Sequence, residues 1–202
     1  FWKLRKQRFV DLFAISHFLC FVSSLRLFRI LVLYNTFERM TAQKLPIGVQ
    51  SFEVLRKNNY LYIDKTGLIP QLLNSRVYFF SRPRRFGKSL LLSMLAAYFH
   101  GKQELFKGLY IEHAEEELAR EENREAWQQY PVLYLDFNTE NYVDSAAIEN
   151  LLNTHLTEWE AEYGRNEVEQ TYSSRFKGVI ERAYKKEQKP VVILIDEYDK
   201  PL

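Results

Sequence analysis

Cysteine is nearly absent from this chain of 202 residues, and the single one, Cys20, cannot form an internal disulfide. The four histidines are scattered and have no partners at the spacing of a zinc site: His17, His100, His113 and His155. Internal repeats and low-complexity stretches are also missing. With 47% hydrophobic and 15% aromatic residues, the sequence instead predicts one ordinary globular domain, and we expect it in the cytoplasm.

A strong excess of one charge is missing as well, since the net charge is only +2. Residues 1–39 carry seven Lys or Arg and two Asp or Glu, a net of +5. The remaining residues carry 21 basic and 24 acidic side chains, a net of −3. The basic character therefore belongs to the first segment, and general polyanion binding by the main domain is not supported.

Long uninterrupted apolar runs are also lacking. Phe9 to Leu33 is rich in Phe, Leu, Val and Ile, but it is interrupted by Asp11, His17, Arg26 and Arg29. A membrane-spanning helix needs about 20 apolar residues in a row. We therefore do not expect a membrane span.

The first 39 residues form a basic, hydrophobic leader. A basic start from Phe1 to Arg8 resembles a signal peptide, but Ser23 to Leu25 is a poor cleavage site. We interpret Met40 as the true start and predict that the domain spans residues 40–202. A membrane-tethered protein is the alternative that depends on the leader.

Apolar runs and helical patterns alternate from Leu45 onwards. Strands are predicted at Tyr60–Ile63, Val77–Phe80, Val132–Phe137 and Val191–Ile195. Helices are predicted after an N-cap at Ser51 and at Leu68–Asn74, Lys88–Tyr98, Glu115–Gln129, Ala146–Tyr163 and Tyr172–Glu187. This alternation predicts an α/β fold with a mostly parallel sheet and helices on both faces.

The segment between the second strand and the third helix matches the Walker A pattern of P-loop NTPases except at its first glycine, where Arg82 stands. In this pattern Lys88 reaches the β- and γ-phosphates, Ser89 binds Mg²⁺, and Gly87 lets the backbone approach the phosphate. The predicted nucleotide-binding residues are Arg82, Pro83, Arg84, Arg85, Phe86, Gly87, Lys88, Ser89 and Leu90.

Two interpretations of this segment stay open. A Gly-Lys-Ser tripeptide is common by chance, and a basic turn before an ordinary helix would leave Lys88 solvated. The predicted strand before it and helix after it are the context that the motif requires. Arg82, Arg84 and Arg85 either clamp phosphate, contact nucleic acid or are simply solvated.

A second motif follows the last strand. Five aliphatic residues, Val191–Ile195, deliver Asp196 and Glu197 to the strand's carboxyl end, where α/β sheets place ligands. Such a Walker B motif predicts that Asp196 holds Mg²⁺ and that Glu197 polarises the attacking water, with Lys88 as the other catalytic residue. Two solvated acids at a strand end are the alternative. Asp136 ends another strand and is interpreted as its terminal cap, with a place beside the nucleotide site as the alternative.

Taken together, the sequence resembles the predicted AAA-ATPase-like proteins of bacteria, which are often followed by a PD-(D/E)XK nuclease-like domain. The resemblance rests on Leu45–Phe52, Tyr62–Thr66, Arg82–Leu90, Tyr130–Phe137 and Ile195–Pro201. The arginine-rich Walker A variant is itself typical of that family.

The resemblance implies AAA-type roles for Lys88, Ser89, Asp196 and Glu197, and it places Tyr62–Thr66 near the nucleotide. It also implies a P-loop fold truncated after the Walker B strand, because such ATPases continue with a central strand, a sensor residue, an arginine finger and a lid. We therefore expect a fragment that is poorly active alone.

The predicted function is ATP binding and Mg²⁺-dependent ATP hydrolysis, with a nucleic acid, a nuclease-like domain or a second copy of the chain as partner. One alternative is a nucleotide-binding switch or interaction module that does not hydrolyse ATP. Another is a DExD-type helicase, since Asp196 to Asp199 matches that spelling.

Overall fold

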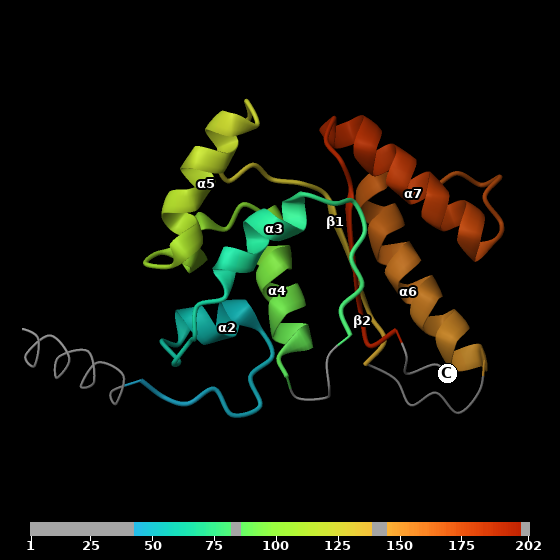
Figure 1. Ribbon diagram of the computed structural model, residues 1–202. Coiled ribbons are helices and arrows are strands. Elements are labelled where there is room, and N and C mark those ends of the chain that lie inside the picture. The colour runs from blue at the N-terminus through green and yellow to red at the C-terminus, as the bar shows by residue number, and fades with distance from the viewer. Residues whose placement is uncertain (1–42, 82–85, 139–144, 199–202) are drawn as a thin grey trace, which may run out of the picture. The chain divides into compact units, whose positions relative to one another are not determined.

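The computed structural model of the chain describes residues 43–81, 86–138 and 145–198. Contacts within the chain separate residues 1–45 from the unit Pro46–Leu202, which holds the helices and strands described below. These are α2 (Phe52–Lys57), η1 (Thr66–Leu68), α3 (Ile69–Leu73), α4 (Lys88–Phe99), η2 (Gln103–Phe106), α5 (Tyr110–Glu121), β1 (Val132–Asp136), α6 (Ser145–Tyr163), α7 (Tyr172–Glu187) and β2 (Val192–Asp196) (Figure 1). Among the helices described, none is long and apolar enough to cross a membrane.

Strands β1 and β2 pair in parallel, with Val132 opposite Val192 and Asp136 opposite Asp196. Helices α6 and α7 connect the two strands, as expected of a parallel crossover. The prediction of an α/β fold is confirmed by this arrangement. Within the described residues the sheet has these two strands.

Helices cover both faces of the sheet (Figure 1). On one face, α4 and its neighbours pack with Leu194 into the larger apolar core. On the other face, Leu133 of β1 packs with Leu156 of α6 and Val179 of α7. Successive strand residues point to opposite faces, so these two strands contribute to both cores.

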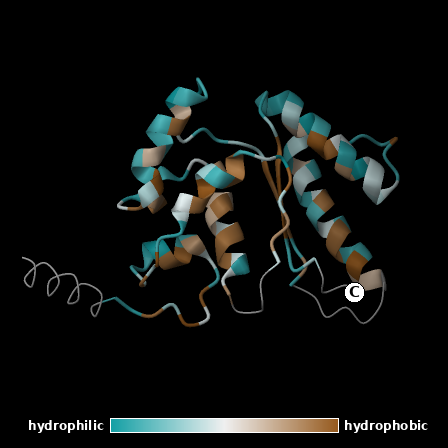
Figure 2. Ribbon diagram, viewed as in Figure 1, coloured by the Kyte–Doolittle hydropathy of each residue, from teal (hydrophilic) through white to brown (hydrophobic). Residues whose placement is uncertain are grey.

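Helix α4 lies at the centre of the larger core. It is hydrophobic nearly all round, as its brown colour in Figure 2 shows, and this is typical of a buried helix. Its buried residues are Leu91, Leu92, Met94, Leu95, Ala97 and Tyr98. The helix ends at Phe99 with His100 as its C-cap, and Gly101 follows with a φ of 67°. The predicted helix and its stop are confirmed.

Two predicted strands are wrong. Val77–Phe80 is irregular, and the exposed fractions of Val77 and Phe79 are 83% and 69%. A β-strand requires a hydrogen-bonding partner, and the described sheet offers this segment none. Tyr60–Ile63 forms only an isolated bridge at Tyr60 and no strand, and its Tyr62 hydroxyl contacts Met94 Sδ of α4 at 3.3 Å.

The charged helix predicted at Glu115–Gln129 is shifted in the structure. Helix α5 begins earlier, at Tyr110, because the Asp64 Oδ2 atom accepts a hydrogen bond from the Tyr110 N–H at 2.7 Å. Thr66 Oγ1 likewise accepts from the next N–H of the helix at 3.2 Å. These contacts satisfy N–H groups that a helix start leaves without partners.

Glu115 is completely buried in α5 although its side chain is charged. Its carboxylate accepts hydrogen bonds from the Tyr98 hydroxyl, the Arg124 guanidinium and the backbone N–H of Trp127. A buried carboxylate is stable only when its oxygens have such partners. The charge density of this segment therefore reflects, in part, a buried network.

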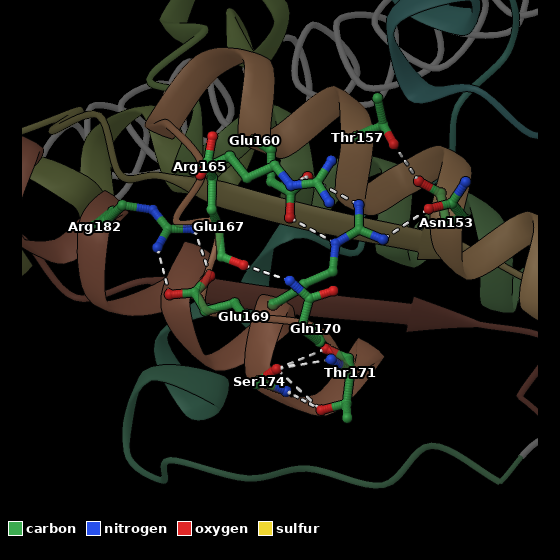
Figure 3. A network of polar contacts seen from close by, with 11 residues as sticks. Asn153, Thr157, Glu160, Arg165, Glu167, Glu169, Gln170, Thr171, Ser174 and Arg182 are labelled. Atoms are coloured by element: carbon green, nitrogen blue, oxygen red, sulfur yellow. Dashed lines mark hydrogen bonds and ion pairs between the residues drawn. The ribbon is translucent and has the colours of Figure 1, made fainter.

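Helices α6 and α7 are joined by a polar network (Figure 3). Arg175 donates two hydrogen bonds to the Glu160 carboxylate, at 2.7 and 2.8 Å, and both residues are buried. Arg182 pairs with Glu169 at 2.7 Å. Helix α7 begins at a capping box between Thr171 and its N3 residue. Both helices were predicted at these positions.

Candidate functional site

The start of α4 and the end of β2 bring two of the predicted site residues together. Lys88 is the first residue of α4, and Glu197 directly follows β2. The Lys88 Nζ atom lies 3.6 Å from the Glu197 Oε2 atom, and both side chains are mostly buried. The two predicted catalytic residues are therefore neighbours in space although they lie far apart in the sequence.

Gly87 sets the conformation at the start of α4. It occupies the N-cap position with a φ of 76°, in the left-handed region that favours glycine. A Cβ atom added here would have no heavy atom within 4 Å, so the backbone angle, and not crowding, requires glycine. No side chain caps this helix, so the N–H groups of its first turn have no competing side-chain acceptor at the N-cap. Such a helix start is suited to an anion.

Asp196 is a buried carboxylate, with an exposed fraction of 2%. Its Oδ1 atom accepts a hydrogen bond from the Glu197 N–H at 2.9 Å. Burial and then the negative charges of Asp196 and Asp136 raise the pKa of the Tyr134 hydroxyl, which keeps it protonated as a donor. The Asp196 carboxylate is therefore buried, held by the Glu197 N–H and close to the Tyr134 hydroxyl.

Asp136 lies opposite Asp196 at the end of β1. Its Oδ1 atom accepts a hydrogen bond from the Asn138 N–H at 2.8 Å, so its interpretation as a strand-terminal cap is confirmed. The two parallel strands thus end in neighbouring carboxylates at the edge of the sheet where α/β folds bind ligands.

Tyr198 was not identified from the sequence. The centroid of its ring lies 5.9 Å from Lys88 Nζ, within the range of a cation–π contact, and 5.2 Å from the centroid of the Phe79 ring. Glu197 has a φ of 52°, so the chain turns sharply between Asp196 and Tyr198. No sequence pattern signals this turn, because residues other than glycine rarely adopt it.

The structure describes some of the remaining predicted nucleotide-binding residues. Arg82, Pro83, Arg84 and Arg85 lie outside the described residues. Phe86 is exposed, Ser89 is half-buried in the first turn of α4, and Leu90 packs against the larger core.

The oxygen donors predicted for Mg²⁺ are the Ser89 hydroxyl and the Asp196 carboxylate. Across residues 43–81, 86–138 and 145–198, no three His, Cys, Asp or Glu side chains gather to hold a metal ion unaided. An all-oxygen set with few protein ligands suits Mg²⁺, which usually keeps waters and shares phosphate oxygens. The buried, hydrogen-bonded Asp196 carboxylate fits this role.

The segment Tyr62–Thr66 was expected near the nucleotide. The contacts that the structure gives it are with α4 and α5: Tyr62 with Met94, and the pair Asp64 and Thr66 with the start of α5. The segment thus packs against α4 and α5, and its place near the nucleotide stays a prediction.

Comparison with known proteins decides the family. A family described as "Predicted AAA-ATPase" matches residues 46–202. The chain belongs to this family. The resemblance drawn from the sequence motifs is thereby confirmed, and the family name of this predicted AAA-ATPase implies an ATPase-type function with ATP as ligand.

A curated relative from Azotobacter chroococcum mcd 1 is named "Uncharacterized protein in vnfD 5'region". It is 38% identical over 166 residues, which cover 81% of this predicted AAA-ATPase and 30% of the relative. The chain therefore aligns with less than a third of that protein's length. No solved structure matches the chain.

Proposed function

We propose that this predicted AAA-ATPase binds ATP together with Mg²⁺ and hydrolyses it. The observation that carries the proposal is the approach of Lys88 to Glu197, at 3.6 Å, beside the buried Asp196. Phosphoryl transfer to water needs a cation at the phosphates, an anchor for a metal and a carboxylate for the water. These three side chains supply one group of each kind at one edge of the sheet.

Each residue has a distinct role in the proposed reaction. The backbone N–H groups at the start of α4 bind phosphate oxygens, and Lys88 neutralises charge that develops on them. Ser89 and Asp196 would hold Mg²⁺, which when bound also neutralises phosphate charge. Glu197 orients a water molecule and accepts its proton. Lys88 must leave Glu197 first, because an ion-paired carboxylate is a weaker base.

Replacement of Glu197 by Gln tests the hydrolytic role. We expect Glu197→Gln to keep nucleotide binding and to lose ATP turnover by about 100-fold or more, the range typical of a lost general base. Steady-state phosphate release and equilibrium binding of a fluorescent ATP analogue measure the two effects. Glu187→Gln, at the exposed end of α7, is the matched control. Turnover that persists unchanged in Glu197→Gln would refute this role.

A nucleotide-binding switch is the second candidate, and the Lys88–Glu197 ion pair favours it, because the pair neutralises the proposed base. Binding of ATP without turnover in the unaltered protein, under conditions where Mg²⁺ is in excess, would favour the switch over the hydrolase.

We also infer that the sheet of the whole domain has more than the two strands described. Ile193 and Ile195 of β2 are 40% and 44% exposed, while their partners Leu133 and Leu135 on β1 are buried. The irregular Val77–Phe80 segment is exposed in addition. Hydrogen exchange on the full-length gene product tests this inference: slow amide exchange at residues 77–80 supports it, and fast exchange there contradicts it.

The partners of the whole protein are a further part of the proposal. By resemblance to the family, we propose a nuclease-like domain or a nucleic acid as the partner, self-association into oligomers, and a cytoplasmic location where ATP is available. Light scattering of the full-length gene product with and without ATP tests self-association, and a mass that stays at one copy would contradict it.

A further inference from the structure

Three segments meet at the ring of Tyr198. The Lys88 ammonium group lies 5.9 Å from the ring centroid, and the Phe79 ring lies 5.2 Å away at an interplanar angle of 59°. Lys88 begins α4, Phe79 precedes the Walker A segment, and Tyr198 follows the Walker B acids. One aromatic side chain therefore contacts elements from both nucleotide-binding motifs.

The backbone conformation at Glu197 determines the position of the Tyr198 ring. Glu197 adopts a φ of 52°, a left-handed conformation that few residues other than glycine adopt. The Asp196 carboxylate accepts the Glu197 N–H at 2.9 Å and so supports the turn. As a result, the Glu197 carboxylate and the Tyr198 ring both approach the same ammonium group.

Core packing does not account for the ring pair. Phe79 is 69% exposed and Tyr198 is 42% exposed, so most of the first ring and much of the second face solvent. The face of a tyrosine ring carries partial negative charge and attracts a cation. The common feature of Glu197 and Tyr198 is thus their attraction for Lys88.

We propose that Tyr198 is a positioning residue: together with Glu197 it holds Lys88 in a resting position that the lysine must leave when phosphate binds. The inference rests on the proposed nucleotide site. Bound nucleotide competes with the carboxylate and the ring for the same ammonium group, so the resting contacts lower the affinity for phosphate. The Phe79 ring packs against the Tyr198 ring and so helps to fix its position.

Substitution of Tyr198 by Leu or by Phe separates the ring from its bulk. Leu keeps an apolar side chain but removes the aromatic face, whereas Phe keeps that face. We expect Tyr198→Leu to bind Mg²⁺ and AMP-PNP about two- to fivefold more tightly than the unaltered protein, the range of an exposed cation–π contact. Tyr198→Phe should keep the affinity of the unaltered protein. Equal or weaker binding by Tyr198→Leu, measured by calorimetry, would overturn the proposal.

An NMR measurement tests the resting position without relying on affinity. The ε-methylene protons of Lys88, assigned with Lys88→Arg, should show an upfield ring-current shift in the nucleotide-free protein. The shift should persist in Tyr198→Phe, vanish in Tyr198→Leu, and decrease when AMP-PNP is added to the unaltered protein. Absence of the shift before nucleotide is added refutes the proposal. Its presence in a protein that binds no AMP-PNP would instead refute the nucleotide site, so the two failures are distinct.

Discussion

The molecule contains two pairings of a basic side chain with a glutamate that differ in almost every respect. Between α6 and α7, Arg175 grips Glu160 through two hydrogen bonds of 2.7 and 2.8 Å. At the end of β2, Lys88 and Glu197 approach only to 3.6 Å. The first geometry is bidentate and directional, whereas the second is a looser contact of a point charge.

The difference corresponds to what each pair does. A fully engaged, buried pair holds two helices together, and Arg175 adds a hydrogen bond to Asn153 of α6 at 2.7 Å. A looser pair at the edge of the sheet leaves both groups able to exchange partners. Geometry can therefore distinguish ion pairs that stabilise a fold from ion pairs whose members change partners when a ligand binds. The following variants test that distinction.

Loss of Lys88 should have the largest effect, which is a decrease in ATP turnover. We expect Lys88→Ala to lower ATP turnover by about 100-fold or more, because a cation at developing phosphate charge is lost. Its free energy of unfolding, measured in urea, should change by less than about 1 kcal/mol, as for other incompletely buried ion pairs.

The control for that variant is Lys177→Ala, which removes an exposed lysine of α7. It should leave both quantities unchanged. Unfolding of Lys88→Ala at much lower urea would show that the 3.6 Å pair is structural, and the comparison would fail.

Loss of Arg175 should instead lower the free energy of unfolding. We expect Arg175→Met to lower the free energy of unfolding by about 3 kcal/mol, because the buried Glu160 carboxylate loses its charged partner. Arg165→Ala is the matched control, since Arg165 is exposed and lies 3.9 Å from the same carboxylate. A loss of similar size in both variants would contradict the special role of the bidentate pair.

Loss of Asp64 should have a smaller effect. Its carboxylate accepts bonds from the Thr66 N–H and hydroxyl and from the Tyr110 N–H, at 2.7 to 2.8 Å. We expect Asp64→Ala to lower the free energy of unfolding by about 1–2 kcal/mol, as for a lost helix cap. Glu117→Ala, on the exposed face of α5, should cost much less. Equal losses would show that the cap contributes nothing specific.

The pH dependence of stability should show the smallest effect. Hydrogen bonds from Arg175, partly opposed by burial, hold the pKa of Glu160 below its ordinary value of 4.5. The unfolded chain therefore takes up this proton at higher pH than the folded protein does. The stabilising contribution is complete above that ordinary pKa and is lost as the pH falls towards the folded one.

Urea unfolding between pH 5.5 and 3.5 measures this dependence. In Glu160→Gln the slope of stability against pH should be shallower by at most about 1.4 kcal/mol per pH unit, the limit for one proton. Glu149→Gln, on the exposed part of α6, should keep the slope of the unaltered protein. An unchanged slope in Glu160→Gln would contradict the lowered pKa.

The sequence could predict those parts of the fold that local pattern determines. Strands β1 and β2 are continuous apolar runs, and α4, α6 and α7 have apolar residues at helical spacing. Val77–Phe80 has the same composition as a buried strand, but its state depends on a neighbouring strand that no local pattern supplies. The burial of Glu115 likewise depends on Tyr98 and Arg124, which reach it from other segments.

The candidate site was predicted to a similar extent. The Gly-Lys-Ser tripeptide before a predicted helix located Lys88, although the strand predicted before it is irregular, and the carboxyl end of a strand located Asp196 and Glu197. Lys88 begins a helix and does not end a strand, so its approach to Glu197 depends on the packing of α4 against β2. Tyr198 could not be predicted, because its position depends on the left-handed turn at Glu197. The arginines of the Walker A segment stay a prediction.

The bond from the Tyr110 N–H to Asp64 has a consequence for cooperativity. It joins residues 46 positions apart and so closes a chain loop that contains both the Walker A segment and α4. Fixing the ends of a loop reduces the conformations open to everything between them. Helices α4 and α5 should therefore open together as one unit in hydrogen exchange, and nucleotide bound at the start of α4 would slow the opening of both.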